Sequence, residues 1–131
     1  MPIEMLEKWR PYVRSILRIV VALLFLQHGL EKLFGFPAAG PPLTGLIILA
    51  ALIETFGGLL LLVGLWSREA AFIMSGEIAV AYFMRRAPNG FFPQVNGGGF
   101  EVLVCFVFLF LFFAGPGPWS VDATRRPTAK I

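Results

Sequence analysis

Hydrophobic residues fill four long stretches of the chain, and short polar or Pro/Gly-rich segments separate them. The apolar stretches cover approximately residues 12–34, 43–66, 69–86 and 100–114. A helix needs about 20 mainly apolar residues to cross the hydrocarbon core of a bilayer. The pattern therefore predicts an all-α membrane protein, a bundle of four transmembrane helices. Because the last two stretches are short, we expect their ends to extend into the flanking glycines and arginines.

The segments between these stretches contain strong helix breakers. Residues 35–42 hold three prolines, and residues 87–99 are rich in Gly, Pro and Asn. Proline lacks the N–H that an inner helical turn needs, so these segments are expected to be irregular connectors. The basic start of the chain and the apolar run 19–26 also resemble a signal peptide, but the polar residues 27–32 that follow favour a first membrane span. We divide the chain into one membrane domain, 1–122, and a basic tail, 123–131.

Composition and charge support this assignment. Of the 131 residues, 57% are hydrophobic and 15% are charged, whereas a soluble domain has about 25% charged residues. The net charge is +3, but the basic residues lie at the ends of apolar runs. That placement indicates membrane topology, with Arg14 and Arg18 reaching the headgroups, and no nucleic-acid partner.

The distribution of Lys and Arg predicts the orientation in the membrane. With four spans, both termini and the turn at Arg68 lie on one side, which then carries eight of the 11 basic residues, while Lys32, Arg85 and Arg86 lie on the other. Cytoplasmic loops carry the excess of Lys and Arg. Both termini are therefore predicted to be cytoplasmic.

The chain has one cysteine, Cys105, and one histidine, His28. A single cysteine excludes an internal disulfide or a dithiol relay within the chain. A single histidine gives little basis for a metal site, and we expect none. No glycine-rich nucleotide-binding loop occurs in the sequence.

Two acidic residues fall near the middle of apolar stretches, Glu54 in the second and Glu77 in the third. An ionisable group at that depth is unfavourable by a few kcal/mol, so each needs a partner or a function. Glu54 shares a helix face with Gly57 and Gly58, which allows close packing against another helix. Both glutamates are predicted to point into the bundle, where Lys32 is the cation of the first stretch that can reach them.

Further polar residues belong to the same, non-cytoplasmic end of the bundle. We expect a polar chamber that opens outward, lined by His28, Lys32, Glu54, Glu77, Asn96 and Glu101, with Arg86 nearby. Two interpretations remain open. The charges form static pairs that set helix register, or they conduct protons to a lipid-soluble redox carrier.

Several short motifs together resemble the DoxX family of bacterial inner-membrane proteins. They are His28-Gly29, Lys32 to Gly35, Glu54 to Leu65, Arg68, Ala70-Ala71, Ala81 to Met84, Pro88, Gly90 to Pro93, Asn96 to Gly98 and Gly115 to Asp122. The resemblance implies a four-helix, multi-pass protein of the inner membrane that is linked to redox metabolism. Relatives include the membrane subunit of a thiosulfate:quinone oxidoreductase.

Two positions depart from the family pattern. Arg86 stands where a histidine is common, and Gly99 follows the glycine pair where an acid is common, the acid here being Glu101. If the missing groups are catalytic, this protein is an accessory paralogue.

The expected function is that of a quinone-linked subunit beside a redox partner protein. Glu54, His28, Lys32 and Glu77 are the candidate catalytic residues, and Asn96, Glu101 and Arg86 are the candidate quinone-binding residues. The alternative is a structural or assembly subunit of a larger membrane complex, and self-association is compatible with either. A transporter is disfavoured because four short spans leave little room for a pore.

Overall fold

A computed structural model describes residues 2–35 and 44–125, and those residues are helical wherever they are regular, with no strand among them. The helices are α1 (Ile3–Phe34), α2 (Gly45–Val63), α3 (Ser67–Arg85), the short 3₁₀ turn η1 (Ala87–Asn89), α4 (Pro93–Asn96), α5 (Gly99–Ala114) and α6 (Val121–Arg125). The predicted apolar stretches correspond to α1, α2, α3 and α5. The main difference is that α1 begins at Ile3 instead of near residue 12. Of the predicted tail 123–131, residues 126–131 lie outside the described residues.

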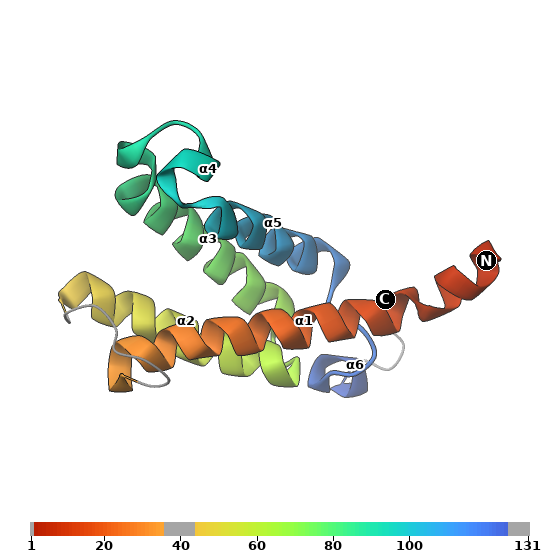
Figure 1. The fold of residues 1–131 in the computed structure, drawn as a ribbon. Coiled ribbons are helices and arrows are strands. Elements are labelled where there is room, and N and C mark those ends of the chain that lie inside the picture. Colours follow the sequence, from red (N-terminus) through yellow and green to blue (C-terminus); the bar gives the residue numbers. More distant parts are fainter. Residues whose placement is uncertain (1, 36–43, 126–131) are drawn as a thin grey trace.

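The four long helices form two antiparallel pairs that diverge from each other (Figure 1). Helix α1 lies along α2, and α3 lies along α5. The pairs meet where α2 turns into α3, and buried side chains such as Phe25, Leu61, Met74 and Phe108 fill that region. Away from it the space between α2 and α3 widens, and this widening positions the site described below.

Small residues allow α1 and α2 to pack closely. A Cβ atom added at Gly29 would lie 2.9 Å from the backbone nitrogen of Thr55, and one added at Gly58 would lie 3.3 Å from the Cα of Leu26. The glycine face predicted around Glu54 is therefore confirmed as a packing face, and Gly57 receives the side chain of Met74 in the same way.

The turn between α2 and α3 is capped by a residue from the far end of the chain. The Asp122 carboxylate accepts hydrogen bonds from the backbone N–H of Trp66 at 2.9 Å and of Ser67 at 2.8 Å. Trp66 adopts a left-handed conformation with φ of 49°, which a non-glycine residue rarely adopts. Asp122 therefore supplies the acceptors for N–H groups at the start of α3, which have no partner within the helix.

Arg18 does not reach the headgroups, so that prediction is wrong. Its side chain is 1% exposed. The guanidinium donates to the carbonyl of Leu61 at 2.8 Å, to that of Trp119 at 2.7 Å and to that of Pro116. Arg18 thus binds the last turn of α2 to the loop that follows α5, and these carbonyls satisfy its buried charge.

The outer surface of the helices is strongly apolar. Helix α5 exposes Phe106, Phe110 and Phe113, and α1 exposes Val13, Ile16 and Val20. Helices α1 and α2 are each long and apolar enough to cross a membrane, and α5 is a shorter apolar helix. Such a continuous apolar surface indicates contact with lipid.

Candidate functional site

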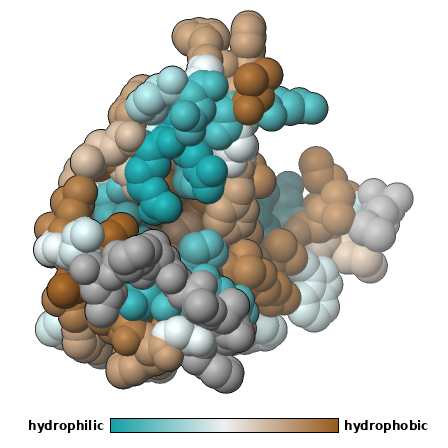
Figure 2. Space-filling model, turned by 60° about the vertical axis from the view of Figure 1, so that its left-hand side comes forward, coloured by the Kyte–Doolittle hydropathy of each residue, from teal (hydrophilic) through white to brown (hydrophobic). Residues whose placement is uncertain are grey.

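A cavity of about 350 Å³ lies between the two helix pairs, with α1 and α2 on one side and α3 and α5 on the other. Figure 2 shows it as a hollow with hydrophilic side chains along part of its edge. The volume falls in the range of sites for small organic ligands, which starts near 300 Å³. Most of the lining is hydrocarbon, contributed by Ile47, Ile53, Ile73, Val80 and Met84 among others.

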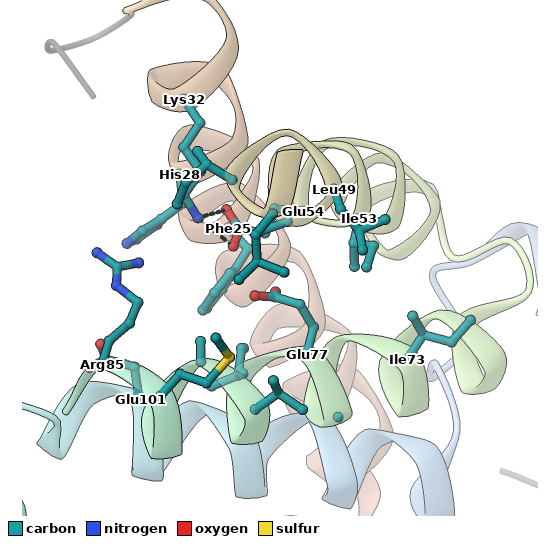
Figure 3. Close-up of a pocket in the computed structure, with 18 of the residues that line it drawn as sticks. Phe25, His28, Lys32, Leu49, Ile53, Glu54, Ile73, Glu77, Arg85 and Glu101 are labelled. Carbon is teal, nitrogen blue, oxygen red and sulfur yellow. Dashed lines mark hydrogen bonds and ion pairs between the residues drawn. The ribbon is translucent and has the colours of Figure 1, made fainter. Parts of the chain in front are cut away.

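The strongest polar interaction in this cavity joins α1 to α2. The Lys32 ammonium donates to both carboxylate oxygens of Glu54, each at 2.7 Å. The two side chains are 10% and 4% exposed. The pairing of Lys32 with an interior glutamate is therefore confirmed, and the carboxylate remains at the wall of the cavity (Figure 3).

Glu77 on α3 faces this ion pair from the opposite wall. Its carboxyl group points toward Glu54 in Figure 3, and its Oε1 atom is buried with no hydrogen-bond partner among the described residues. The hydrogen bonds of the Lys32 ammonium go to Glu54 and not to Glu77. Because a buried polar atom without a partner is unfavourable, the Glu77 Oε1 atom is available to a polar group of a bound molecule.

His28 lies in a group of stacked aromatic rings. Its ring is nearly parallel to that of Phe25 at 5.0 Å and to that of Phe100 at 5.8 Å. The Nδ1 atom lies 2.8 Å from the carbonyl oxygen of Leu24. Since a carbonyl only accepts, Nδ1 carries the hydrogen, and Nε2 is the nitrogen left to interact with a ligand.

Glu101, in the first turn of α5, and Arg86, just after α3, differ in their position relative to the cavity. Glu101 lines the cavity, and its carboxylate accepts a hydrogen bond from Arg86 Nε at 2.9 Å. Arg86, one of the two positions that depart from the family pattern, is therefore in contact with the acid nearest to the other, Gly99. Arg86 supports the wall without lining the cavity, and its neighbour Arg85 lines it instead.

Asn96 lies outside the cavity, and the prediction that it lines the chamber is wrong. Its amide donates to the hydroxyl of Tyr82 and to the carbonyl of Gly90, both at 3.0 Å, and its Oδ1 accepts from the N–H of Gly98 at 2.8 Å. The side chain is buried and holds together the connector that begins at Arg86. Asn96 therefore stabilises the connector between α3 and α5.

The sequence did not identify the aromatic and aliphatic walls of the cavity. Phe25 precedes His28 by three positions, so helical spacing places the two on one face, but this signal does not distinguish a cavity wall from a packed core. Within residues 2–35 and 44–125, no group of three His, Cys, Asp or Glu side chains is arranged to hold a metal ion.

Fold and site together define a small helical membrane protein with a charged, otherwise apolar cavity between two helix pairs. The DoxX family model matches residues 13–87. The chain belongs to the DoxX family.

Two relatives extend the match over most of the chain. A protein of Haemophilus influenzae, described as uncharacterized, is 42% identical over 128 residues, which cover 89% of this chain and 93% of the relative. An uncharacterized membrane protein of Mycobacterium tuberculosis is 28% identical over 138 residues, covering 86% of this chain and 82% of the relative. No solved structure matches the chain.

Proposed function

We propose that this protein is a four-span protein of the bacterial inner membrane that binds a quinone in the cavity between its helix pairs and supports electron transfer with a partner protein. The observation that carries the proposal is a largely apolar cavity that holds the Lys32–Glu54 ion pair and Glu77, whose Oε1 atom has no hydrogen-bond partner among the described residues. Quinones need an apolar site with a few hydrogen-bonding groups.

The proposed topology uses α1, α2, α3 and α5 as spans, with both termini in the cytoplasm. The excess of Lys and Arg at the termini and near Arg68 supports this orientation. The cavity then opens toward the non-cytoplasmic half of the bilayer, since Lys32 lies in the last turn of α1 and Arg85 in the last turn of α3.

The polar groups of the cavity match the chemistry of quinone reduction. That reaction adds two electrons and two protons to the two carbonyl oxygens, giving a quinol. In this proposal the Glu77 carboxyl donates a hydrogen bond and then a proton to one oxygen, and it is reprotonated from the non-cytoplasmic side, while the other oxygen takes its proton from water that enters from that side. The Lys32–Glu54 pair supplies a fixed positive charge near the oxygens that gain electron density.

The electrons come from a redox centre in a partner protein. The chain has a single cysteine and a single histidine, so its own side chains do not provide a dithiol or a bis-histidine haem site. In the opposite direction, oxidation of a quinol returns two electrons to the partner and two protons to the same carboxyl path.

The test compares two identical substitutions on one helix. Glu77→Leu removes the hydrogen-bond and proton donor inside the cavity, and Glu69→Leu changes an exposed glutamate on the same helix α3. Titration of the purified protein in nanodiscs with a short-chain ubiquinone analogue measures Kd for each. A hydrogen bond from an ionisable group contributes about 1.5–3 kcal/mol, so Glu77→Leu is expected to raise Kd by roughly 10-fold or more.

The control Glu69→Leu leaves Kd within twofold of the parent. Glu54→Gln, checked for an unchanged expression level, also weakens binding, because Lys32 loses its position. Equal affinity for all three variants and the parent would contradict the quinone site.

A second candidate function is a non-catalytic assembly subunit. It is favoured by the contact between Arg86 and Glu101, because the arginine that stands where the family commonly has a histidine is used for a structural ion pair. This candidate predicts purification in fixed stoichiometry with a larger complex in mild detergent, or as a homo-oligomer, and no quinone binding.

A further inference from the structure

The cavity has a lateral opening between α2 and α3. Five of its apolar lining residues are 54–57% exposed. They are Leu46 and Leu49 on α2 and Ile73, Val80 and Met84 on α3. A side chain that both lines a cavity and faces the surroundings stands at an opening, so the cavity is continuous with the outer surface along this side.

The opposite side of the cavity, between α1 and α5, is filled by aromatic rings. Phe25 is 4% exposed, and its ring stacks on Phe100 at 5.9 Å and meets the edge of Phe108 at 5.1 Å. A long chain leaving the cavity at this level therefore passes between α2 and α3.

Most residues at the lateral opening are apolar, and the exception is Arg85, which is exposed and lines the cavity next to Met84. Glu54 and Glu77 come from the same two helices that form the opening, and Figure 3 shows their carboxyl groups turned toward each other inside it. Leu46 lies eight residues before Glu54 on α2, which is about 12 Å along a helix. The apolar side chains of α2 thus extend the cavity wall from Glu54 to the exposed Leu46.

We infer that the ligand of this cavity carries a long alkyl or isoprenoid tail, which leaves between α2 and α3 into the bilayer while the ring stays beside Glu54 and Glu77. The inference rests on the proposed quinone site and specifies its substrate class. The site selects tailed, membrane-resident quinones over tail-free, water-soluble ones. The physical reason is that hydrocarbon gains free energy in proportion to the apolar area that it buries, and the opening offers that area only to a tail.

The experiment uses the full-length protein in nanodiscs and two quinones with the same head group, one without a side chain and one with a decyl chain. Val80→Trp and Leu49→Trp each narrow the opening from one of its two sides. Leu59→Trp is the matched control, because Leu59 is an exposed residue of α2 that does not line the cavity. The ratio of variant Kd to parent Kd is compared for each quinone separately, so that partitioning of the decyl compound into lipid cancels.

Val80→Trp and Leu49→Trp are expected to raise Kd for the decyl quinone by at least tenfold and to leave Kd for the tail-free quinone within twofold. Leu59→Trp changes neither. Both positions tolerate a larger side chain because they are exposed, and thermal unfolding of each variant checks this.

Different outcomes test the tail path and the head-group site. If the parent binds both quinones and the two blocking variants change both affinities equally, or neither, then the tail path is refuted and the head-group site stands. If the parent binds neither quinone, the proposed function itself is refuted, and the tail path with it.

Discussion

Because Lys32 lies beside two glutamates, we expect the loss of Lys32 and the loss of Glu54 to lower the stability of the protein by different amounts. Lys32→Met leaves Glu54, which is 4% exposed, facing Glu77 without its hydrogen-bonded cation. Glu54→Gln removes one acid and keeps Lys32 within reach of the other. Removal of one partner from a buried ion pair costs about 3–5 kcal/mol in soluble proteins, and polar interactions inside membrane bundles are weaker, on average about 0.6 kcal/mol. We expect about 2–3 kcal/mol for Lys32→Met, because two carboxyl groups are left, and about 1 kcal/mol for Glu54→Gln.

Thermal unfolding in detergent measures these changes. With an entropy of unfolding typical for this chain length, Lys32→Met should lower Tm by on the order of 10 °C, and Glu54→Gln should lower it by about a third of that. The double variant Lys32→Met with Glu54→Gln should recover part of the loss, since only Glu77 then remains. The reasoning is refuted if the double variant is no more stable than the sum of the two single changes, or if Glu54→Gln is the more harmful of the two.

Three further predictions test packing, the buried arginine and the topology. Gly29→Ala should lower Tm clearly, because its new methyl group meets the backbone of α2, whereas Gly76→Ala meets open space and should be neutral or stabilising by up to about 1 kcal/mol; equal effects would contradict the close α1–α2 contact. Arg18→Met should be destabilising by about 3 kcal/mol or more and Arg18→Lys by less, measured by the same thermal unfolding, because Met leaves the backbone carbonyls without a donor; a stable Arg18→Met variant would remove Arg18 from the fold's essential contacts. In a cysteine-free background, a cysteine at Asn89 should react with an impermeant thiol reagent added to intact cells and one at Glu69 should not, and the reverse pattern would invert the topology.

The positions of the helices could be predicted from the sequence because apolar runs and helix breakers are local signals. Prolines and glycines end the helices where expected, and Gly64 terminates α2 in the left-handed conformation with φ of 75°. The inward direction of Glu54 followed from its spacing to two glycines. The partner of Glu54 followed from the scarcity of cations on the first span.

The remaining contacts could not be predicted, because their partners are distant in sequence or carry no side-chain signal. Arg18 binds backbone carbonyls, which every residue possesses, so nothing in the sequence marks Leu61 or Trp119 as acceptors. Asn96 was placed in the chamber because amides suit polar ligands, but the connector needs that amide for its own backbone. Arg85 and Arg86 are adjacent at the end of α3, and only the path of the connector decides which one lines the cavity.

The burial of Arg18 has a consequence for how the protein is made. The acceptors of its guanidinium at Pro116 and Trp119 lie 98 and 101 residues further along the chain. At about 5–20 residues per second, the ribosome synthesises that stretch in roughly 5–20 s. During this time the guanidinium lacks two of its acceptors, although the Leu61 carbonyl is already available. The contacts that bind α1 to the loop after α5 therefore form only once residues 116–119 have been synthesised, and a chain that stops before residue 116 cannot form them.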